Sequence, residues 1–249
     1  ASRDCRMHSD PRGERRLMRN LLYHARVGSH AYGTATVDSD EDFVEVVVEE
    51  PNFITGLDRF DTEMSTNTGR TLAGGQDVTT YGLRKWASLV AAGNPNMIET
   101  LFIPNEVHQV GHDLLGQRWW LLAVGNRDAF LSKQAGYRFL GYAQSQQFAL
   151  MGVKNKRTNR PELVHKHGYD TKFAGHLIRV LLEGLDLMRT GMLSFPLPEA
   201  AYIRSVRAGE VEKDDLLSLA NDLRRRASRS PPACGTCCSP GRPSSSTSR

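Results

Sequence analysis

Cysteines and long apolar runs are both scarce in this 249-residue sequence. Three of the four cysteines, Cys234, Cys237 and Cys238, crowd near the C-terminus and leave Cys5 for the rest of the chain, which excludes a disulfide framework. No stretch approaches about 18 consecutive apolar residues, and the first residues lack the apolar core of a signal peptide. The sequence therefore predicts a soluble, cytoplasmic protein without a membrane partner.

A net positive charge is missing from most of the chain, although the formal net charge is +4. Residues 224–249 contain six arginines and no acidic residue, and residues 1–27 contain seven arginines against three acidic residues. The segment between them is therefore acidic overall. This distribution does not indicate a protein that binds nucleic acid through a surface that is basic everywhere.

The composition is that of a globular chain, with 39% hydrophobic and 24% charged residues. It is sufficient for one sizeable core or two small ones. We expect an α+β or α/β fold, with a small mixed sheet in residues 1–104 and a mostly helical domain in residues 105–228. Residues 229–249 are rich in Ser, Pro, Gly and Cys, which predicts a disordered tail.

The spacing of apolar residues predicts the individual elements. In the first half we expect a helix at 10–26, strands at 43–48 and 77–81, a helix at 83–90, and at most one short helix within 52–75. In the second half we expect helices at 127–152, 170–189 and 214–226, with loops at 154–160 and 165–167. Glu99 follows a helix stop at residues 93–95 and is expected to cap or brace the next helix.

Asp40 and Asp42 stand at the start of the first predicted strand. Side chains two apart on a strand point to the same side, so these two carboxylates converge. Asp77 opens the second predicted strand, and we expect it to join them. Three converging carboxylates are costly without a cation, and Mg²⁺ or Mn²⁺ often shares its shell between carboxylates and substrate phosphates. Taken alone, an acidic run such as 38–42 is more typical of a solvated turn.

Gly28 and Ser29 form a small-residue turn ahead of these acidic residues. Backbone N–H groups of such a turn, together with the Ser29 hydroxyl, are suited to contact phosphates. The combination of this turn with the carboxylates favours phosphoryl or nucleotidyl transfer.

Three other metal-site patterns are incomplete. The acidic run 38–42 fits the ligand spacing of a calcium-binding EF-hand, but Phe43 stands where that loop requires glycine. His108 and His112 have helical spacing but lack the glutamate of a zinc protease motif. The cysteines of the tail lack a second pair of zinc ligands. We therefore expect none of these sites.

An ordered series of motifs gives the sequence a family resemblance. Gly28-Ser29, ten further residues, Asp40-x-Asp42 leading into an apolar strand, and then Asp77 at the start of another strand resemble the signature of the DNA polymerase beta nucleotidyltransferase superfamily. The resemblance extends over residues 15–230 to the predicted nucleotidyltransferases that are associated with RNA-ligase repair operons and are common in phages. The further blocks are Asp77–Lys85, Gly93–Glu99, Phe130–Lys133, Gly141–Ala143 and Gly168–Arg179.

The resemblance implies a role for each residue of this signature. Asp40 and Asp42 would bind the metal that bridges the nucleotide phosphates. Asp77 would complete a second metal site and position or deprotonate the acceptor hydroxyl. Gly28 and Ser29 would hold the triphosphate. These roles imply transfer of a nucleoside monophosphate from a nucleoside triphosphate such as ATP to a hydroxyl, with release of pyrophosphate.

Four polar residues form a stripe on the predicted helix at 170–189. They are Lys172, His176, Arg179 and Glu183. A solvated face explains such a stripe. The alternative, which the resemblance favours, is that Lys172 and Arg179 face the cleft and bind nucleotide phosphates.

The acceptor is the open part of this hypothesis. An RNA 3′ end is the first choice that the resemblance implies, and the basic loop at 154–160 either contacts that RNA or is simply solvated. A protein side chain or a small molecule is the next choice, and a toxin-like enzyme that modifies tRNA or a protein would share the chemistry. A catalytically silent nucleotide-binding or RNA-binding module is the alternative from another class, but it has no need of three acidic residues. The oligomeric state stays open.

Overall fold

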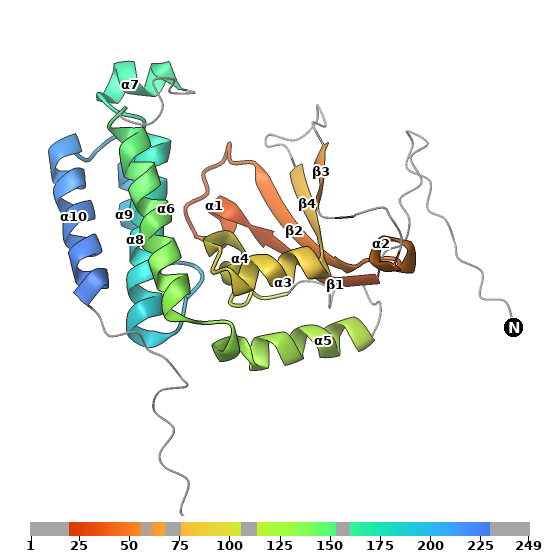
Figure 1. Cartoon of the computed structure of the whole chain (residues 1–249). Helices are drawn as coiled ribbons and strands as arrows, with labels where there is room; N and C mark the ends of the chain where they lie inside the picture. The colour runs from red at the N-terminus through yellow and green to blue at the C-terminus, as the bar shows by residue number, and fades with distance from the viewer. Residues whose placement is uncertain are drawn as a thin grey trace, which may run out of the picture.

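A computed structural model describes residues 20–55, 60, 62–67, 76–105, 114–152 and 160–229. Its strands are β1 (Asn20–Val27), β2 (Glu41–Val48), β3 (Thr62–Asn67) and β4 (Gln76–Gly82). Its helices (Figure 1) are α1 (Gly28–Ala31), α2 (Pro51–Thr55), α3 (Leu83–Ala91), α4 (Pro95–Glu99), α5 (Leu114–Gly125), α6 (Lys133–Leu150), α7 (Pro161–His167), α8 (Thr171–Thr190), α9 (Ala200–Ala208) and α10 (Lys213–Arg229), with the short 3-10 turn η2 (Arg127–Ala129) before α6.

The four strands form one mixed sheet in the order β1-β2-β4-β3. The central strand β2 runs antiparallel to β1 and parallel to β4, and β3 runs antiparallel to β4. Val44 and Val46 of β2 are buried in the core, as expected for a β-branched strand between two neighbours. The mixed sheet and the strands predicted at 43–48 and 77–81 are confirmed.

The predicted helix at 10–26 is wrong from residue 20 onward, where the chain forms β1; its earlier part lies outside the described residues. Leu21, Leu22 and Ala25 do have helical spacing, but β2 provides an antiparallel partner along the whole segment. Tyr23 and Ala25 therefore alternate into the core. A register shift between Leu21 and Tyr23 lets Leu22 be buried as well. Pairing with β2 outweighs the local spacing.

Helices α3 and α5 pack side by side on the sheet. Trp120 of α5 lies 4.1 Å from the ring of Tyr23 and 5.1 Å from that of Trp86, measured between ring centroids. The indole N–H of Trp86 donates to the hydroxyl of Thr100 at 3.0 Å, which satisfies its one polar atom in the core. Helix α5 begins after residue 104 yet packs on β1. The division of the chain into two domains after residue 104 stays a prediction.

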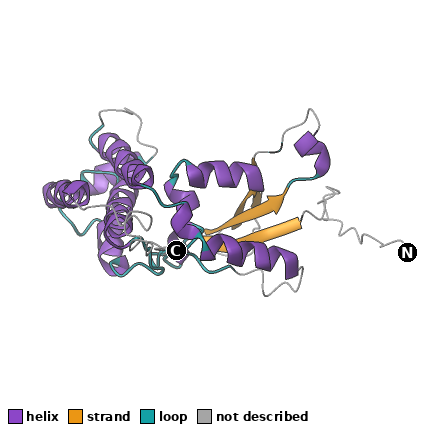
Figure 2. Cartoon of the chain, turned by 60° about the horizontal axis from the view of Figure 1, so that its bottom comes forward, coloured by secondary structure: helices purple, strands orange, loops and turns teal. Residues whose placement is uncertain are grey.

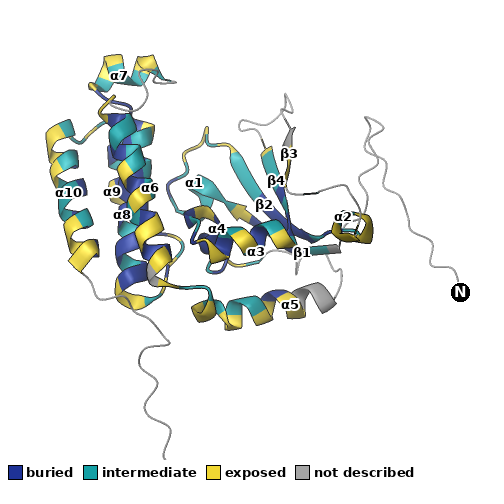
Figure 3. Cartoon of the chain, viewed as in Figure 1, coloured by how far each residue is buried: buried dark blue, intermediate teal, exposed yellow. Residues whose placement is uncertain are grey.

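Helices α6, α8, α9 and α10 form a bundle beside the sheet (Figures 1 and 2). Helix α8 is at its centre, because it contacts each of the other three, and most of its length is buried (Figure 3). Asp170 caps α8 by accepting two backbone N–H groups. Gly184 allows α6 to approach closely, since a β-carbon there would lie 3.0 Å from that of Phe139. The helices predicted at 83–90, 127–152, 170–189 and 214–226 are confirmed apart from their ends.

Apolar spacing misses β3, α5, α7 and α9. The described side chains of β3, at 62–64, are exposed, so this edge strand has no apolar alternation to detect. Residues 165–167, predicted as a loop, lie in α7. At most one short helix is expected within 52–75, and the described residues of that range contain α2, which begins at Pro51. Across the described ranges, no helix is both long enough and apolar enough to cross a membrane.

Candidate active site

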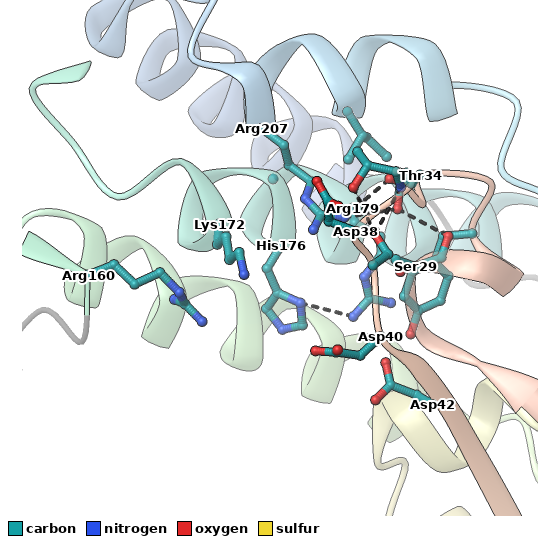
Figure 4. Close-up of a pocket in the computed structure, with 15 residues that line it drawn as sticks. Ser29, Thr34, Asp38, Asp40, Asp42, Arg160, Lys172, His176, Arg179 and Arg207 are labelled. Carbon is teal, nitrogen blue, oxygen red and sulfur yellow. Dashed lines mark hydrogen bonds between the residues drawn. The ribbon is translucent and has the colours of Figure 1, made fainter. Parts of the chain in front are cut away.

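A cavity of about 600 Å³ opens between the sheet and the bundle (Figure 4). The segment from α1 to the start of β2 forms one side, and helices α8 and α9 form the other. Its charged and hydroxyl-bearing lining residues include Ser29, Thr34, Asp38, Asp40 and Asp42 on the sheet side, and Arg160, Lys172, His176, Arg179 and Arg207 on the bundle side. The cavity is therefore acidic on one side and basic on the other.

The turn at Gly28 requires glycine for two reasons. Its φ of 66° lies in the left-handed region that other residues rarely adopt. A β-carbon at this position would also collide with the Asp42 carboxylate. Gly28 thus brings the backbone against Asp42, and Ser29 follows directly on the cavity wall. The predicted small-residue turn is the first turn of the one-turn helix α1.

Asp42 and Asp77 are register partners on the parallel strands β2 and β4, so their side chains point to the same face of the sheet. Burial raises the pKa of the Asp42 carboxyl, and the charges of Asp77 and Asp40 raise it further, while His30 lowers it. The structure therefore brings Asp40 and Asp77 each within electrostatic reach of Asp42. Asp40 and Asp42 line the cavity, whereas Asp77, the register partner of Asp42, is half-exposed and is not one of the lining residues.

The three carboxylates do not enclose a metal ion by themselves. In the part of the chain that the structure describes, no three histidine, cysteine, aspartate or glutamate side chains converge closely enough to hold one. Mg²⁺ commonly takes one or two protein carboxylates and completes its shell with water and substrate phosphates. The carboxylates of Asp40, Asp42 and Asp77 fit such an open site, in which the nucleotide supplies the remaining ligands.

The polar stripe of α8 faces the cavity rather than bulk solvent along most of its length. Lys172, His176 and Arg179 all line the cavity (Figure 4). Lys172 is exposed, whereas Arg179 and Glu183 are 3% and 1% exposed. A solvated face is therefore wrong for the second half of the stripe.

Arg179 is held in a buried ion-pair cluster. Its Nη1 donates to Glu99 Oε1 at 2.7 Å and to the two carboxylate oxygens of Glu183 at 2.9 and 2.8 Å. The Tyr32 hydroxyl donates to Glu99 Oε2 at 2.7 Å, and the Tyr32 ring lies 4.1 Å from the Arg179 guanidinium. Burial, with the charge of Glu99, raises the pKa of Glu183 despite the neighbouring guanidinium. The cluster joins α8 to α4 and to Tyr32, and so fixes both sides of the cavity.

His176 connects this cluster to α6. Its Nδ1 lies 3.1 Å from Arg179 Nη2 and its Nε2 lies 3.2 Å from the Tyr142 hydroxyl. Burial lowers the pKa of His176 to about 3, with a contribution from Arg179, so the ring is neutral near pH 7. Because arginine can only donate, Nδ1 accepts the hydrogen bond from Arg179. Nε2 therefore carries the hydrogen and donates it in a hydrogen bond to the Tyr142 hydroxyl.

Arg207 is a cavity residue that sequence reasoning missed, because it lies on the unpredicted helix α9. Its side chain crosses α8 at Gly175, where a β-carbon would lie 2.6 Å from Arg207 Cγ. Its Nη1 donates to the Thr34 carbonyl and hydroxyl at 3.3 and 3.4 Å. Burial lowers the pKa of Arg207, and the nearby charge of Arg160 lowers it further. A glycine in the interior of helix α8 was the available signal of a close approach.

Several predicted features lie outside the described residues. These are His108, His112, most of the basic loop at 154–160, and the cysteines of the tail at 234–238. Arg160, the last residue of that loop, is described and lines the cavity, where its guanidinium lies 3.5 Å from Asp170.

Comparisons with known proteins give a family model, a phage relative and a solved structure. A family model described as RlaP, RNA repair pathway DNA polymerase beta family, matches residues 11–230. An uncharacterized 38.9 kDa protein from the nrdC-mobD intergenic region of Enterobacteria phage T4 is 33% identical over 134 residues, which are 52% of this chain and 38% of that protein. The chain thus spans well under half the length of this relative. A nucleotidyltransferase-like protein of known structure from Exiguobacterium sibiricum matches 84% of this chain and 65% of its own, with a TM-score of 0.30 and 9% identity.

Proposed function

Because the chain belongs to the RNA repair pathway DNA polymerase beta family, we propose that it is a metal-dependent nucleotidyltransferase. It transfers a nucleoside monophosphate from a nucleoside triphosphate, such as ATP, to the 3′ hydroxyl of an RNA. The observation that supports this most directly is the pairing of Asp42 with Asp77 on adjacent parallel strands, beside a cavity that Asp40 also lines.

The acidic side of the cavity suits a divalent cation. Asp40, Asp42 and Asp77 offer hard oxygen ligands, and their crowding is relieved when a cation is present. These carboxylates would hold Mg²⁺ or Mn²⁺, which would supply positive charge that allows the phosphates to approach and favours an ionised acceptor hydroxyl. The carboxylates themselves set where that charge is placed.

The basic side of the cavity suits the triphosphate. The exposed ammonium of Lys172 and the half-buried guanidinium of Arg207 face the acidic residues across the cavity, where they neutralise phosphate oxygens. The Ser29 hydroxyl contacts the phosphates from the sheet side. Arg179 also lines the cavity, but its Nη1 is bound to two carboxylates. It contributes less as a phosphate ligand than by holding Tyr32 and His176 in place.

The reaction is an in-line displacement at the α-phosphorus. The acceptor oxygen forms a bond to the α-phosphorus as the bond to the oxygen that bridges to the β-phosphorus breaks, and pyrophosphate leaves. Asp77, beside Asp42 on the neighbouring strand, accepts the proton of the acceptor hydroxyl. The product is an RNA that is longer by one nucleotide.

The test is transfer of label from each α-³²P nucleoside triphosphate to total RNA or to cell protein, with Mg²⁺ or Mn²⁺. The wild-type chain is compared with the isosteric double variant Asp40→Asn/Asp42→Asn. Asp128→Asn is the matched control, because Asp128 is exposed and belongs to η2, away from the cavity lining. Circular dichroism and thermal unfolding establish that each variant folds.

We expect label on RNA with the wild-type chain and with Asp128→Asn, and a loss of at least about a hundredfold with the double variant. Label on protein alone would keep the chemistry and reject RNA as the acceptor. The absence of label on either, together with no metal-dependent nucleotide binding in calorimetry, would reject the enzymatic proposal in favour of a silent nucleotide-binding module.

A further inference from the structure

A second cavity, of about 490 Å³, lies between α6 and α10. Helix α6 contributes Tyr137, Gly141 and Gln144 to its lining, and helix α10 contributes Arg224, Arg225 and Arg229. We call this feature the α6–α10 groove. None of its lining residues belongs to the candidate active site.

The α6–α10 groove combines several arginines with few acidic residues. Helix α6 contains no acidic residue, and the last six residues of α10 contain four arginines. Within the described ranges, Asp222 is the one acid paired with them, at 3.4 Å from Arg225 and 3.9 Å from Arg226. Arg224 and Arg229 have no acidic partner among the described residues. A surface of this kind attracts a polyanion.

The surface of the α6–α10 groove also suits nucleobases. Tyr137 is 60% exposed, although a tyrosine on a helix usually buries its ring against a neighbour. Gly141, one helical turn further along, leaves open space, since a β-carbon there would have no neighbour within 4 Å. An exposed aromatic ring beside arginines is the combination that binds single-stranded nucleic acid, because bases stack on the ring while the arginines contact phosphates.

Helix α6 separates the α6–α10 groove from the active-site cavity. Gly141 lines the groove, whereas the hydroxyl of the next residue, Tyr142, lies 3.2 Å from His176, which lines the active-site cavity. A helix with its side chains is about 10–12 Å across. At about 3.4 Å per stacked nucleotide, roughly three nucleotides cross that distance.

We infer that the α6–α10 groove binds the phosphate backbone and bases of single-stranded RNA about three or more nucleotides upstream of the 3′ hydroxyl that enters the active-site cavity. This inference rests on the proposed function, because it takes RNA as the acceptor. It also accounts for a chain that is acidic in its middle and yet acts on a polyanion, since the phosphate contacts in the groove come from the arginines at the end of α10.

The test is fluorescence anisotropy of a labelled 12-nucleotide single-stranded RNA of mixed sequence, titrated with the full chain at several salt concentrations. The variant Arg224→Glu/Arg229→Glu removes the two unpaired groove arginines. The control is Lys213→Glu/Arg226→Glu, which changes the net charge equally on the same helix at residues that do not line the groove. Tyr137→Ala tests stacking separately.

Each phosphate contact on a single strand adds about 0.7 to the slope of log K against log salt, or roughly fivefold in affinity at 100 mM salt. The groove variant should therefore lose about 25-fold in affinity and about 1.4 in slope relative to the control variant. Tyr137→Ala should lose about fivefold or more without a change in slope.

Equal losses of RNA affinity in the groove and control variants would mean that net charge alone causes the effect, and would overturn the inference. An unchanged slope of log K against log salt in the groove variant would overturn it as well. Label transfer is measured in parallel to separate this inference from the proposed function. Groove-dependent RNA binding without transfer of label would support the groove while the proposed function fails. Transfer of label to protein, with no RNA binding, would overturn the groove and leave nucleotidyl transfer in place.

Discussion

Replacement of Arg179 by methionine tests whether this residue acts mainly through the fold or through the nucleotide. Methionine has a similar length but no charge, so Glu99 and Glu183 would lose the guanidinium that contacts both of them at 2.7–2.9 Å. Both carboxylates are almost completely buried. Removal of one partner from a buried pair costs about 3–5 kcal/mol, because the remaining charge has no compensation. We expect the free energy of unfolding to fall by that amount near pH 7.

The pH dependence of this loss follows from Glu183. Burial already raises the pKa of Glu183 in the wild-type chain, and removal of the Arg179 guanidinium would raise that pKa further. A carboxyl whose pKa is higher in the folded than in the unfolded state lowers stability as the pH rises above the unfolded value of about 4.3. The decrease in stability therefore continues to higher pH in the variant, and the gap to the wild-type chain widens above the pH at which Glu183 ionises in the wild-type chain.

The assay is urea unfolding followed by tryptophan fluorescence, in which the buried residues Trp86 and Trp120 report on the core. Lys172→Met is the matched control, because Lys172 lines the same cavity on the same helix but is exposed. We expect the control to change the free energy of unfolding by less than about 0.5 kcal/mol. A loss of less than about 1 kcal/mol in Arg179→Met, accompanied by loss of ATP binding, would refute this reasoning and make Arg179 a phosphate ligand.

Three further predictions concern other residues. Gly28→Ala should lower the free energy of unfolding by about 1–2 kcal/mol, because alanine disfavours the left-handed backbone at this position. It should also reduce nucleotidyl transfer about a hundredfold, because the new β-carbon displaces Asp42. Gly125→Ala is the control, since a β-carbon there has open space around it. His176 has a pKa of about 3 when folded and about 6.5 when unfolded, so the unfolded state binds more protons between these values and wild-type stability rises with pH. His176→Gln should remove up to about 1.4 kcal/mol per pH unit from that slope in urea titrations from pH 4 to 6.5, and an unchanged slope would mean that His176 is not buried in its neutral form. Trp120→Ala should cost about 3–5 kcal/mol in the same unfolding assay, and a loss below about 1 kcal/mol would show that α5 does not pack on β1.

The elements that the sequence predicts correctly are those with a strong local pattern. Strand β2 is rich in valine, and α8 combines an N-cap aspartate with an apolar stripe that repeats over 20 residues. Strand β1 shows the opposite case, because Leu21, Leu22 and Ala25 fit a helix until a partner strand competes for their backbone hydrogen bonds. Local spacing contains no information about that partner.

The candidate site also contains both residues that local sequence patterns place together and contacts that depend on tertiary packing. Asp40, Asp42 and Asp77 are readable from the sequence, because the strand period and the position of each strand start place them together. The contact between Glu99 and Arg179 joins residues 80 positions apart and depends on how α8 packs beside α4. Arg207 reaches the cavity because Gly175 leaves space for its side chain, a fact that belongs to the packing of two helices. Gly175 indicates that something approaches α8 closely, but no spacing in the sequence identifies Arg207 or pairs Glu99 with Arg179.

The register between β2 and β4 makes the acidic site an all-or-none feature of folding. Asp42 and Asp77 meet because seven consecutive residue pairs, from Glu41 with Gln76 to Val47 with Gly82, are in one alignment. A slip of one residue in either strand would turn one carboxylate to the opposite face of the sheet. Misaligned chains would therefore have no site at all rather than a weakened one. The acidic site therefore forms only when β2 and β4 pair in the correct register, and the same hydrogen bonds between these strands stabilise the sheet and place the two aspartates together.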